Sequence, residues 1–242
     1  MTELNSVNIE EEYQKGVPSC PVGESSCLVI DQALALRKEI FELTEQVNKD
    51  TLTGLYNFRH FRLTLEQEME RTRRTNQPTI LIMLDLDHFK QVNDTWGHEA
   101  GNQALISTAN QLAKVIRRLD IACRYGGEEF ALILPATDLL LGLQVAERVK
   151  ENIEATPVVV EGESIQITAS LGVDLYTAKQ DDTPEQFVAR VDKYLYEAKQ
   201  TGRNRVSHGT IESEGSAASV SKEERDLLSG FFGQRQEETP KP

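Results

Sequence analysis

Apolar residues follow two different periods along this chain, and the period changes repeatedly between residues 28 and 207. Spacings of three and four residues are typical of a helix that buries one face, whereas alternation or a short apolar run is typical of a strand. We therefore predict helices at 58–75, 98–118, 139–155 and 184–201. Strands are predicted at 80–84, 121–124, 130–134, 158–160, 164–175 and 203–207.

The predicted strand at 80–84 is apolar on both faces, which places it in the middle of a sheet. From this strand onward the elements follow the order strand, helix, two strands, helix and strand. That order is typical of a ferredoxin-like sheet with antiparallel central pairing, flanked by helices. The predicted fold class is therefore α+β.

A helical stalk is predicted in front of this domain. Apolar residues recur there at alternating steps of four and three: Val29, Ala33, Leu36, Ile40, Leu43 and Val47. Such spacing is the seam of a coiled coil, but a seam of this length is too short to be stable alone in water. We expect it to pair within a dimer or on a partner protein; the alternative is an amphipathic helix folded back on its own domain.

These patterns divide the chain into four parts. Residues 1–27 form an irregular acidic segment, 28–49 the dimerisation and signalling stalk, 50–207 the folded domain, and 208–242 a disordered tail. Within the tail, four apolar residues share one face: Leu227, Leu228, Phe231 and Phe232. This segment is either a docking site for a partner or a loose tail.

Composition narrows the class of protein. A net charge of −13 argues against a general DNA or RNA binder. The first residues are too acidic for a signal peptide, and no apolar run approaches the roughly 18–20 residues of a membrane span. The three cysteines, Cys20, Cys27 and Cys123, suit a reducing cytoplasm, and we interpret Cys20 and Cys27 as free thiols rather than a zinc site. We expect a cytoplasmic protein with neither DNA nor a membrane span among its partners.

Two acidic positions point to chemistry. Asp85 ends the central strand, and Glu128 lies in RYGGEEF (124–130), at the turn of a predicted hairpin. If the two strands are neighbours, Asp85 and Glu128 converge, and a cation is needed to neutralise their repulsion. Oxygen ligands without histidine or cysteine favour Mg²⁺, with Mn²⁺ as the alternative.

The glycines before Glu128 fit the same interpretation. Gly126 and Gly127 allow positive φ and leave space for a ligand to approach the main chain, although a glycine pair also forms plain hairpin turns. Basic residues that could hold a polyphosphate lie just after the strand and on either side of the C-terminal end of a later helix: Lys90, Lys199 and Arg203.

Five motifs together resemble one family. DTLTGLYN, DLDHFKQVNDTWGHEAGN, RRLDIACRYGGEEF, SLGV and YEAKQTGRNR occur in the order and spacing of the diguanylate cyclase (GGDEF-domain) family, over about Asp50 to Val206. GGEEF is an active variant of the family signature. The resemblance implies a palm-like fold related to nucleotidyl cyclases and the condensation of two GTP into cyclic di-GMP plus pyrophosphate. It also implies a homodimer, since each domain binds one GTP, and a role in bacterial second-messenger signalling such as biofilm control.

The resemblance also implies roles for individual residues. Asp85, the main-chain carbonyl of Leu86 and Glu128 would hold the metal ions, and Glu129 would act near the attacking hydroxyl. The remaining substrate contacts would come from Gly126, Gly127, Asn93, Lys90, Lys199 and Arg203. Asn93 would read the guanine edge and the basic residues would neutralise phosphates. We expect Asp87 to serve the local loop structure instead.

One position departs from the family. The motif that usually ends GHxxGD ends here with Asn102. A carboxylate accepts from both guanine N1–H and the 2-amino group, whereas an amide has a single acceptor oxygen. We therefore expect weaker or less selective GTP binding rather than loss of activity.

A second site is implied upstream. RRLD places Arg117 and Asp120 where the family has its product-inhibition site, and Arg148 resembles its supporting arginine. By itself, RxxD is a frequent helix-end pattern. A non-catalytic cyclic di-GMP receptor or scaffold is the alternative to an enzyme, and Asn102 is the feature that favours it. Because we recognise no sensor module ahead of the stalk, we expect a regulatory protein to bind the N-terminal helix or tails, or self-association to activate the chain.

Overall fold

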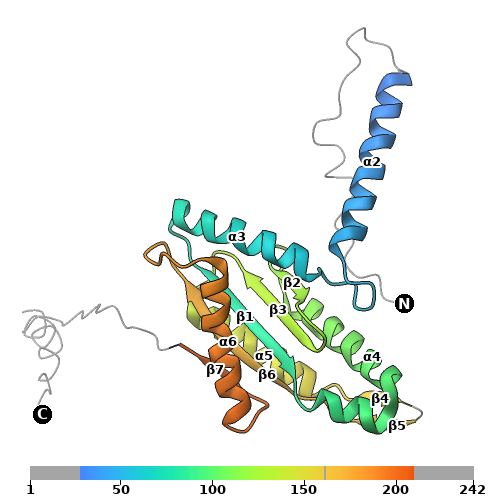
Figure 1. The fold of residues 1–242 in the computed structure, drawn as a ribbon, viewed down its shortest axis with the longest axis vertical. Helices are drawn as coiled ribbons and strands as arrows, with labels where there is room; N and C mark the ends of the chain where they lie inside the picture. The colour runs from blue at the N-terminus through green and yellow to red at the C-terminus, as the bar shows by residue number, and fades with distance from the viewer. Residues whose placement is uncertain (1–27, 161, 210–242) are drawn as a thin grey trace, which may run out of the picture. The chain divides into compact units, whose positions relative to one another are not determined.

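The structure, a computed structural model of the 242-residue chain, describes residues 28–160 and 162–209. The predicted acidic segment, Cys20, Cys27 and the apolar positions of the tail lie outside these residues. The described part centres on a five-stranded sheet (Figure 1). In sheet order its strands are β2 (Ile121–Arg124), β3 (Glu129–Leu134), β1 (Thr79–Leu86), β6 (Ala169–Tyr176) and β7 (Val206–His208).

The central position of β1 confirms the prediction from its apolar pattern. All eight residues of β1 are buried, and the strand pairs antiparallel with β3 on one side and β6 on the other. β2 extends the sheet antiparallel to β3, and β7 lies parallel to β6 at the opposite edge. A separate two-stranded sheet joins β4 (Val158–Val160) to β5 (Glu163–Ile165).

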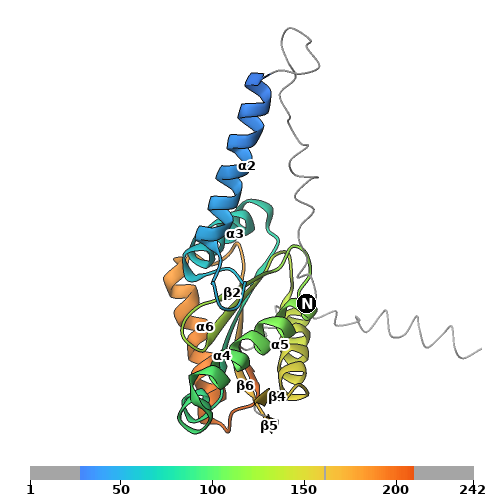
Figure 2. The ribbon, with the colours of Figure 1, turned by 90° about the vertical axis from the view of Figure 1, so that its right-hand side faces the viewer.

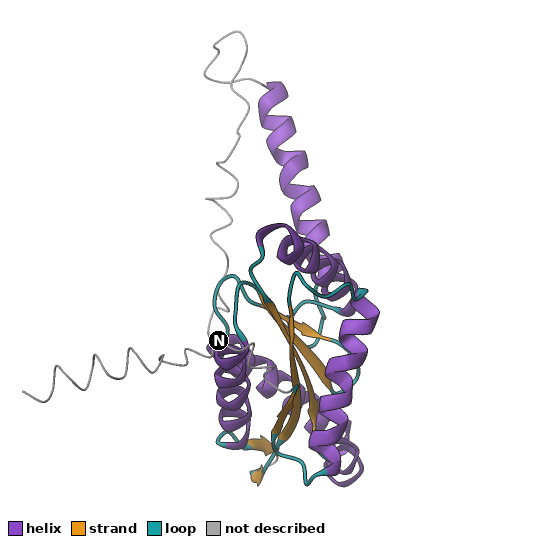
Figure 3. Cartoon of the chain, turned by 90° about the vertical axis from the view of Figure 1, so that its left-hand side faces the viewer, coloured by secondary structure: helices purple, strands orange, loops and turns teal. Residues whose placement is uncertain are grey.

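Helices cover both faces of the sheet. One face carries α4 (Phe89–Val115) and α5 (Leu139–Glu154), and the other face carries α3 (Phe58–Thr75) and α6 (Pro184–Gln200) (Figures 1 and 2). Alternate residues of β1 divide between the two cores: Ile80, Ile82 and Leu84 face the α4 side, and Leu81 and Met83 the α3 side. Figure 3 shows the strands enclosed between these helical layers. The predicted α+β class is therefore confirmed.

The glycine of SLGV brings α6 close to the sheet. A Cβ on Gly172 would collide with the main-chain oxygen of Val191 and the main-chain nitrogen of Leu195. Since backbone would have to move to admit even a methyl group, the helix packs directly on β6. This contact holds the C-terminal end of α6 beside the end of β1.

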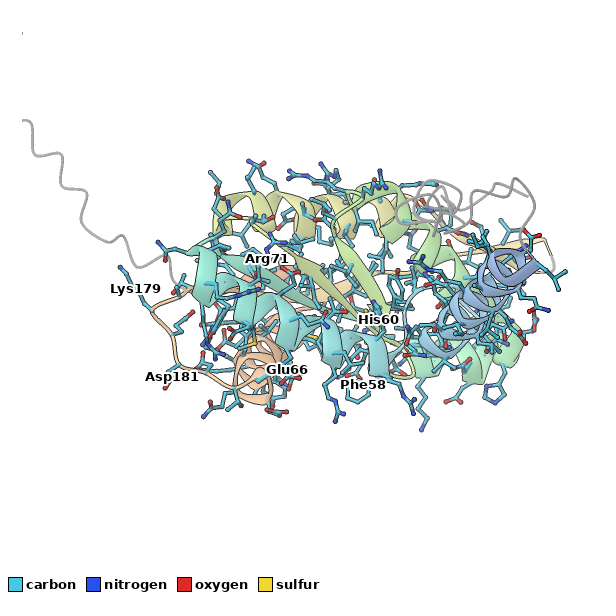
Figure 4. All side chains as sticks on the ribbon, turned by 90° about the horizontal axis from the view of Figure 1, so that it is seen from above. Phe58, His60, Glu66, Arg71, Lys179 and Asp181 are labelled. Atoms are coloured by element: carbon cyan, nitrogen blue, oxygen red, sulfur yellow. The ribbon has the colours of Figure 1, made fainter. Side chains whose placement is uncertain are left out.

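Most predicted helices begin and end within one residue of their observed limits. α3 matches its prediction, and its inward residues Phe61, Leu65 and Met69 are buried. α6 begins with a capping box in which Thr183 and Gln186 exchange hydrogen bonds, and it ends one residue before the predicted limit. Viewed from above, α3 lies along its face of the sheet with Phe58 and His60 near its start and Arg71 towards its end (Figure 4).

The helix predicted at 98–118 is wrong at both ends. α4 starts at Phe89 and contains a break at Gly97, whose φ of 82° and ψ of 166° are not helical. The part before the break was missed because only Phe89 and Val92 in it are buried, too few to set a period. The second part stops at Val115, where Ile116 turns to extended backbone.

The strand predicted at 164–175 is in fact two strands in different sheets. β5 pairs with β4, residues 166–168 cross over, and β6 joins the main sheet. Ile165, Ile167 and Ala169 are all buried, so the alternating pattern continues through the crossover. The last strand also begins later than predicted, because Arg203 and Asn204 have left-handed backbone with φ of 56° and 46°.

The stalk is a single helix, α2 (Leu28–Asn48), and four residues of its predicted seam are exposed. Leu36, Ile40, Leu43 and Val47 are between 53% and 60% exposed. The alternative in which this face packs back on its own domain is therefore not supported by the described residues. None of the helices described is both long and apolar enough to span a bilayer.

Candidate active site

The acidic residues meet where β1 ends beside the β2–β3 hairpin. Asp85, 7% exposed, pairs with Glu129 across β1 and β3, and the Leu86 N–H donates to the Glu128 main-chain oxygen at 3.3 Å. Directly opposed residues of an antiparallel pair have side chains on the same face of the sheet. The structure thus brings Asp85, Glu128 and Glu129 together, as expected for neighbouring strands, and the register sets Glu129 opposite Asp85.

This arrangement disfavours the ionised form of the three carboxyl groups. Burial raises the pKa of Asp85, against the opposing effect of the Lys199 ammonium. Burial also raises the pKa of Glu128 and of Glu129, and the nearby Asp85 charge adds to both shifts. Three carboxyl groups that repel one another at the end of a buried strand form a site that a cation would stabilise.

The donor atoms fit a hard divalent cation. They are carboxylate oxygens of Asp85, Glu128 and Glu129 and the main-chain oxygen of Leu86. In the described part of the chain, no three His, Cys, Asp or Glu side chains are gathered closely enough to hold a metal ion by themselves. Mg²⁺ usually takes one or two carboxylates and completes its shell with water and substrate phosphate. The site fits a metal that arrives with a nucleotide.

Lys199 is the predicted basic residue that the structure brings into this cluster. It lies in the last turn of α6, and its Nζ is 2.7 Å from Asp85 Oδ2. Lys90, in the first turn of α4, and Arg203, after α6, are exposed. The Arg203 main-chain N–H closes α6 by donating to the Ala198 oxygen at 3.0 Å.

Asp87 holds three segments around the site together. Its carboxylate accepts from Thr168 Oγ1 at 2.8 Å, Ser170 Oγ at 2.6 Å and the Asn204 main-chain N–H at 3.0 Å. These contacts support the expected local role for Asp87. Sequence reasoning did not single out Ser170 or Asn204, although both lie in the motifs SLGV and YEAKQTGRNR.

The glycine pair acts through missing side chains rather than through positive φ. The described glycines with positive φ are Gly54, Gly97, Gly162 and Gly202, so Gly126 and Gly127 do not use the positive φ that glycine allows. A Cβ on Gly126 would lie 2.6 Å from Glu129 Oε2, whereas one on Gly127 would meet nothing within 4 Å. Gly126 therefore leaves room for the Glu129 carboxylate, and Gly127 keeps the turn open.

The break in α4 lets the Asn93 side chain lie against the segment that carries Asn102. A Cβ on Gly101 would overlap the Asn93 Oδ1, so the Asn93 side chain lies against Gly101, the neighbour of Asn102. Asn93 precedes Gly97 and Asn102 follows it. Both asparagines are half-buried.

The three residues predicted for a product site lie close together. The Arg117 main-chain N–H donates to Asp120 Oδ2 at 2.8 Å, and Arg148 Nη2 donates to the Val115 oxygen at 3.1 Å. Burial raises the pKa of Asp120, while the Arg117 hydrogen bond and the charges of Arg117 and Arg148 oppose that shift. The two arginines from different elements therefore lie around one carboxylate.

Comparison with known proteins agrees with the family resemblance seen in the five motifs. Residues 47–205 match the family described as "Diguanylate cyclase, GGDEF domain". The response regulator PleD of Caulobacter vibrioides is 39% identical over 173 residues, which cover 71% of this chain and 38% of PleD. The chain thus spans less than half the length of that relative.

Solved structures show the same fold. The diguanylate cyclase SiaD of Pseudomonas aeruginosa, in complex with its activator SiaC, is 38% identical with a TM-score of 0.69, over 75% of this chain and 69% of SiaD. The coiled coil and GGDEF domain of DgcB from Caulobacter crescentus, in complex with c-di-GMP, is 27% identical with a TM-score of 0.69. That match covers 74% of this chain and 94% of the DgcB chain.

Proposed function

The chain belongs to the diguanylate cyclase family defined by the GGDEF domain, and on this premise we propose that it converts two GTP into cyclic di-GMP and two pyrophosphates. The observation that carries the proposal is the meeting of Asp85, Glu128, Glu129 and Lys199 at the end of β1. In each of two steps, a 3′-hydroxyl oxygen bonds to the α-phosphorus of the other GTP, and the bond from that phosphorus to pyrophosphate breaks. Each domain holds one GTP, so two domains must face each other.

In this proposal Asp85, the Leu86 carbonyl and Glu128 hold Mg²⁺ or Mn²⁺. The bound metal would supply Lewis-acid stabilisation of the charge that develops on the phosphate oxygens. Glu129 orients the 3′-hydroxyl and accepts its proton, since its carboxylate lies opposite Asp85 and beside the residues that would hold the metal. The glycine turn leaves the main chain open to the nucleotide.

The basic residues neutralise the triphosphate. Lys199 balances Asp85 in this structure, and its ammonium would contact a phosphate whose metal ion is held by the same carboxylate. Lys90 and Arg203 add positive charge from two further elements. Asn93 and Asn102 contact the guanine edge.

Product controls the rate through the second site in our proposal. Arg117 and Arg148 bind the phosphates and guanines of cyclic di-GMP, and Asp120 accepts from guanine. Bound product holds the two half-sites apart. In Arg117→Ala, synthesis should continue as product accumulates, and product inhibition equal to that of the unmodified chain would remove this part of the proposal.

The stalk sets how two chains meet. Its exposed seam is suited to pairing with a second copy. SiaD is seen with a separate activator, SiaC, which supports regulation of this chain by a protein partner, and the GGDEF domain of DgcB is seen with a coiled coil, which supports a paired stalk. We place the protein in the cytoplasm, where GTP is available.

A receptor that binds cyclic di-GMP without making it is the second candidate, favoured by Asn102. A receptor has no need for the carboxylate cluster, so one substitution there separates the two functions. Purified full-length protein with GTP and Mg²⁺ should form cyclic di-GMP, and Glu128→Gln should lose at least a hundredfold in rate, about 2.7 kcal/mol of transition-state stabilisation.

The matched control for this experiment is Glu70→Gln. Glu70 is an exposed glutamate on α3 that pairs with Arg73 and Arg74. Its substitution should leave the rate unchanged. If the two variants are equally active, the carboxylate cluster is not the catalytic site.

A further inference from the structure

Arg124 connects the active-site hairpin to the turn where the stalk enters the domain. It is the last residue of β2, just before the turn that carries the glycine pair. Its Nε donates to the main-chain oxygens of Gly126 and Gly127, both at 3.2 Å, and its Nη2 donates to the Gly127 oxygen at 2.8 Å. One edge of the guanidinium therefore holds the carbonyl groups of both glycines.

The other end of the same guanidinium holds Asp50. Nη1 of Arg124 lies 3.3 Å from Asp50 Oδ1 and 3.2 Å from Oδ2. The two side chains are 19% and 20% exposed, so water screens this pair less than a surface ion pair. Arginine is suited to this bridge because its planar group donates several hydrogen bonds in fixed directions, which a lysine ammonium cannot do.

Asp50 is itself fixed in a closed turn. Its Oδ1 accepts from the Thr53 main-chain N–H at 2.9 Å and from Thr53 Oγ1 at 2.6 Å, and its own N–H donates to the Leu55 oxygen at 2.8 Å. Burial would raise the pKa of Asp50, but the Thr53 hydrogen bonds and the Arg124 charge outweigh burial and lower it. The carboxylate is therefore ionised and held in place.

The end of the stalk is bonded to the same turn through Asn57. Its Nδ2 donates to the oxygens of Val47 at 2.7 Å and Lys49 at 3.3 Å, at the end of α2. Its Oδ1 accepts from the His60 N–H at 3.1 Å and caps α3; Figure 4 labels His60 near the start of that helix. One side chain closes α2 and begins α3, so a change in the direction of α2 would act on the turn that contains Asp50.

Arg124 restrains the hairpin in addition to the hairpin's own backbone hydrogen bonds. Two adjacent glycines have more backbone freedom than any other pair, and Glu128 and Glu129 follow them directly. A displacement of about 1 Å at a reacting group can cost about a hundredfold in rate. Arg124 holds the carbonyl groups just before these two glutamates. A small movement of the Asp50 turn would therefore pass through Arg124 to the catalytic carboxylates.

We propose that Arg124 is a positioning residue that couples the stalk to catalysis, because it joins the Asp50 turn to the carbonyls of Gly126 and Gly127. When the Asp50 turn is in place, the hairpin is held ready for GTP and metal. When the stalk moves the turn, the hairpin loosens. The inference rests on the proposed function, because the hairpin it positions is the one assigned there to catalysis.

The first test is a double-mutant cycle on Asp50→Asn and Arg124→Lys. Each substitution keeps a similar size but removes the charge pair or the forked geometry. Each should lower kcat about tenfold, which corresponds to an increase of about 1.36 kcal/mol in the activation free energy. The loss should fall more on kcat than on KM for GTP, because the guanine contacts proposed at Asn93 and Asn102 lie on α4 and are not altered. The double variant should be no slower than either single variant, since both remove one connection.

Matched controls separate positioning from loss of stability. Asp138 accepts from the N–H three residues ahead at the start of α5, as Asp50 does from Thr53. Arg190 forms ion pairs with Asp174 and Asp182 near the other end of β6. Asp138→Asn and Arg190→Lys should lower thermal stability while kcat stays unchanged. If they reduce kcat as much as the test variants, Arg124 has only a structural role.

A second readout does not depend on activity. Hydrogen exchange of the backbone amides at 124–129 should be at least tenfold faster in Asp50→Asn than in the unmodified chain or in Asp138→Asn. This measurement applies even if the chain makes no cyclic di-GMP, in which case the proposed function fails separately. Unchanged exchange in the hairpin, or additive effects in the cycle, would overturn the coupling.

Discussion

At the residue scale, the carboxylates of this site are held where charge is costly. Asp85 is nearly buried, and its pKa is raised by that burial in spite of the Lys199 ammonium. A group in this position gains more from a bound cation than an exposed carboxylate does, because the cation removes both the repulsion and the desolvation cost. In the proposed function the same lysine then becomes available to a phosphate, so Lys199 would link metal binding to substrate binding.

Asn102 provides the first prediction at this scale. Asn102→Asp should tighten GTP binding by about 1–2 kcal/mol, or about 5- to 30-fold, because a charge-assisted hydrogen bond replaces a neutral one. Preference for GTP over ATP should rise with it. Asn110→Asp, an exposed change on the same helix, is the control and should do neither. Equal GTP affinity in unmodified and Asn102→Asp proteins would show that residue 102 does not read guanine.

Cys123 gives a second prediction, on pH. Burial raises the pKa of its thiol to about 12, from an ordinary value of 9.0. The unfolded chain loses this proton near pH 9, while the folded chain keeps it up to about pH 12. The Cys123 thiol should therefore lower the free energy of unfolding by about 1.4 kcal/mol per pH unit as pH rises above 9.

The measurement compares urea unfolding of Cys20→Ser/Cys27→Ser with that of the same protein carrying Cys123→Ala, between pH 8 and pH 10.5. The difference between their pH slopes isolates Cys123. The double variant should also resist thiol labelling at pH 8 until it unfolds. Rapid labelling of the folded protein would mean that Cys123 is accessible.

At the element scale, contacts between distant segments decide what the sequence pattern leaves open. Periodicity placed α3, α5 and α6 because each buries one regular face. It gave no sign that α4 breaks at Gly97, since a glycine's φ depends on what packs around it. Nor did it show the crossover at 166–168, where burial continues while the chain changes sheet.

The candidate site could also be predicted from the sequence only in part. Asp85, Glu128 and Lys199 could be brought together from strand order and motif position alone. The Arg124–Asp50 bridge could not, because 74 residues separate its ends and neither side chain belongs to a periodic pattern. The same holds for Ser170 and Asn204 around Asp87, which depend on three segments meeting.

Gly172 provides the prediction at this scale. Gly172→Ala should destabilise the domain by about 1–3 kcal/mol, because α6 must move away from β6 to admit the methyl group. The same movement shifts Lys199, so metal-dependent GTP binding should weaken as well. Gly127→Ala, which meets nothing within 4 Å, should leave the free energy of unfolding nearly unchanged. Equal stability of the two variants in urea would contradict the close packing of α6.

At the scale of the whole molecule, the stalk and the domain differ in how well their apolar residues are covered. The domain buries two cores and needs no partner to cover its described apolar residues on β1. The stalk leaves Leu36, Ile40, Leu43 and Val47 exposed, and the proposed reaction of two GTP needs two domains. Pairing of two stalks would bury the seam and bring two active sites to one another in the same step.

Charge placed in the seam should separate the copies. Leu36→Glu/Leu43→Glu should convert a dimer into a monomer by sedimentation, and specific activity should then rise with protein concentration. Lys38→Glu, at the helical position facing away from the seam, should do neither. A double variant that stays dimeric at micromolar concentration would show that the stalk does not hold the copies together.

The most direct test of the central claim is the product made by the purified full-length chain from GTP and Mg²⁺, identified by mass spectrometry with pyrophosphate counted in parallel. The account predicts one cyclic di-GMP and two pyrophosphates for every two GTP consumed, and no cyclic dinucleotide from ATP alone. A chain that binds cyclic di-GMP but never forms it, at any protein concentration and with Mg²⁺ or Mn²⁺ present, would contradict the account and identify a receptor.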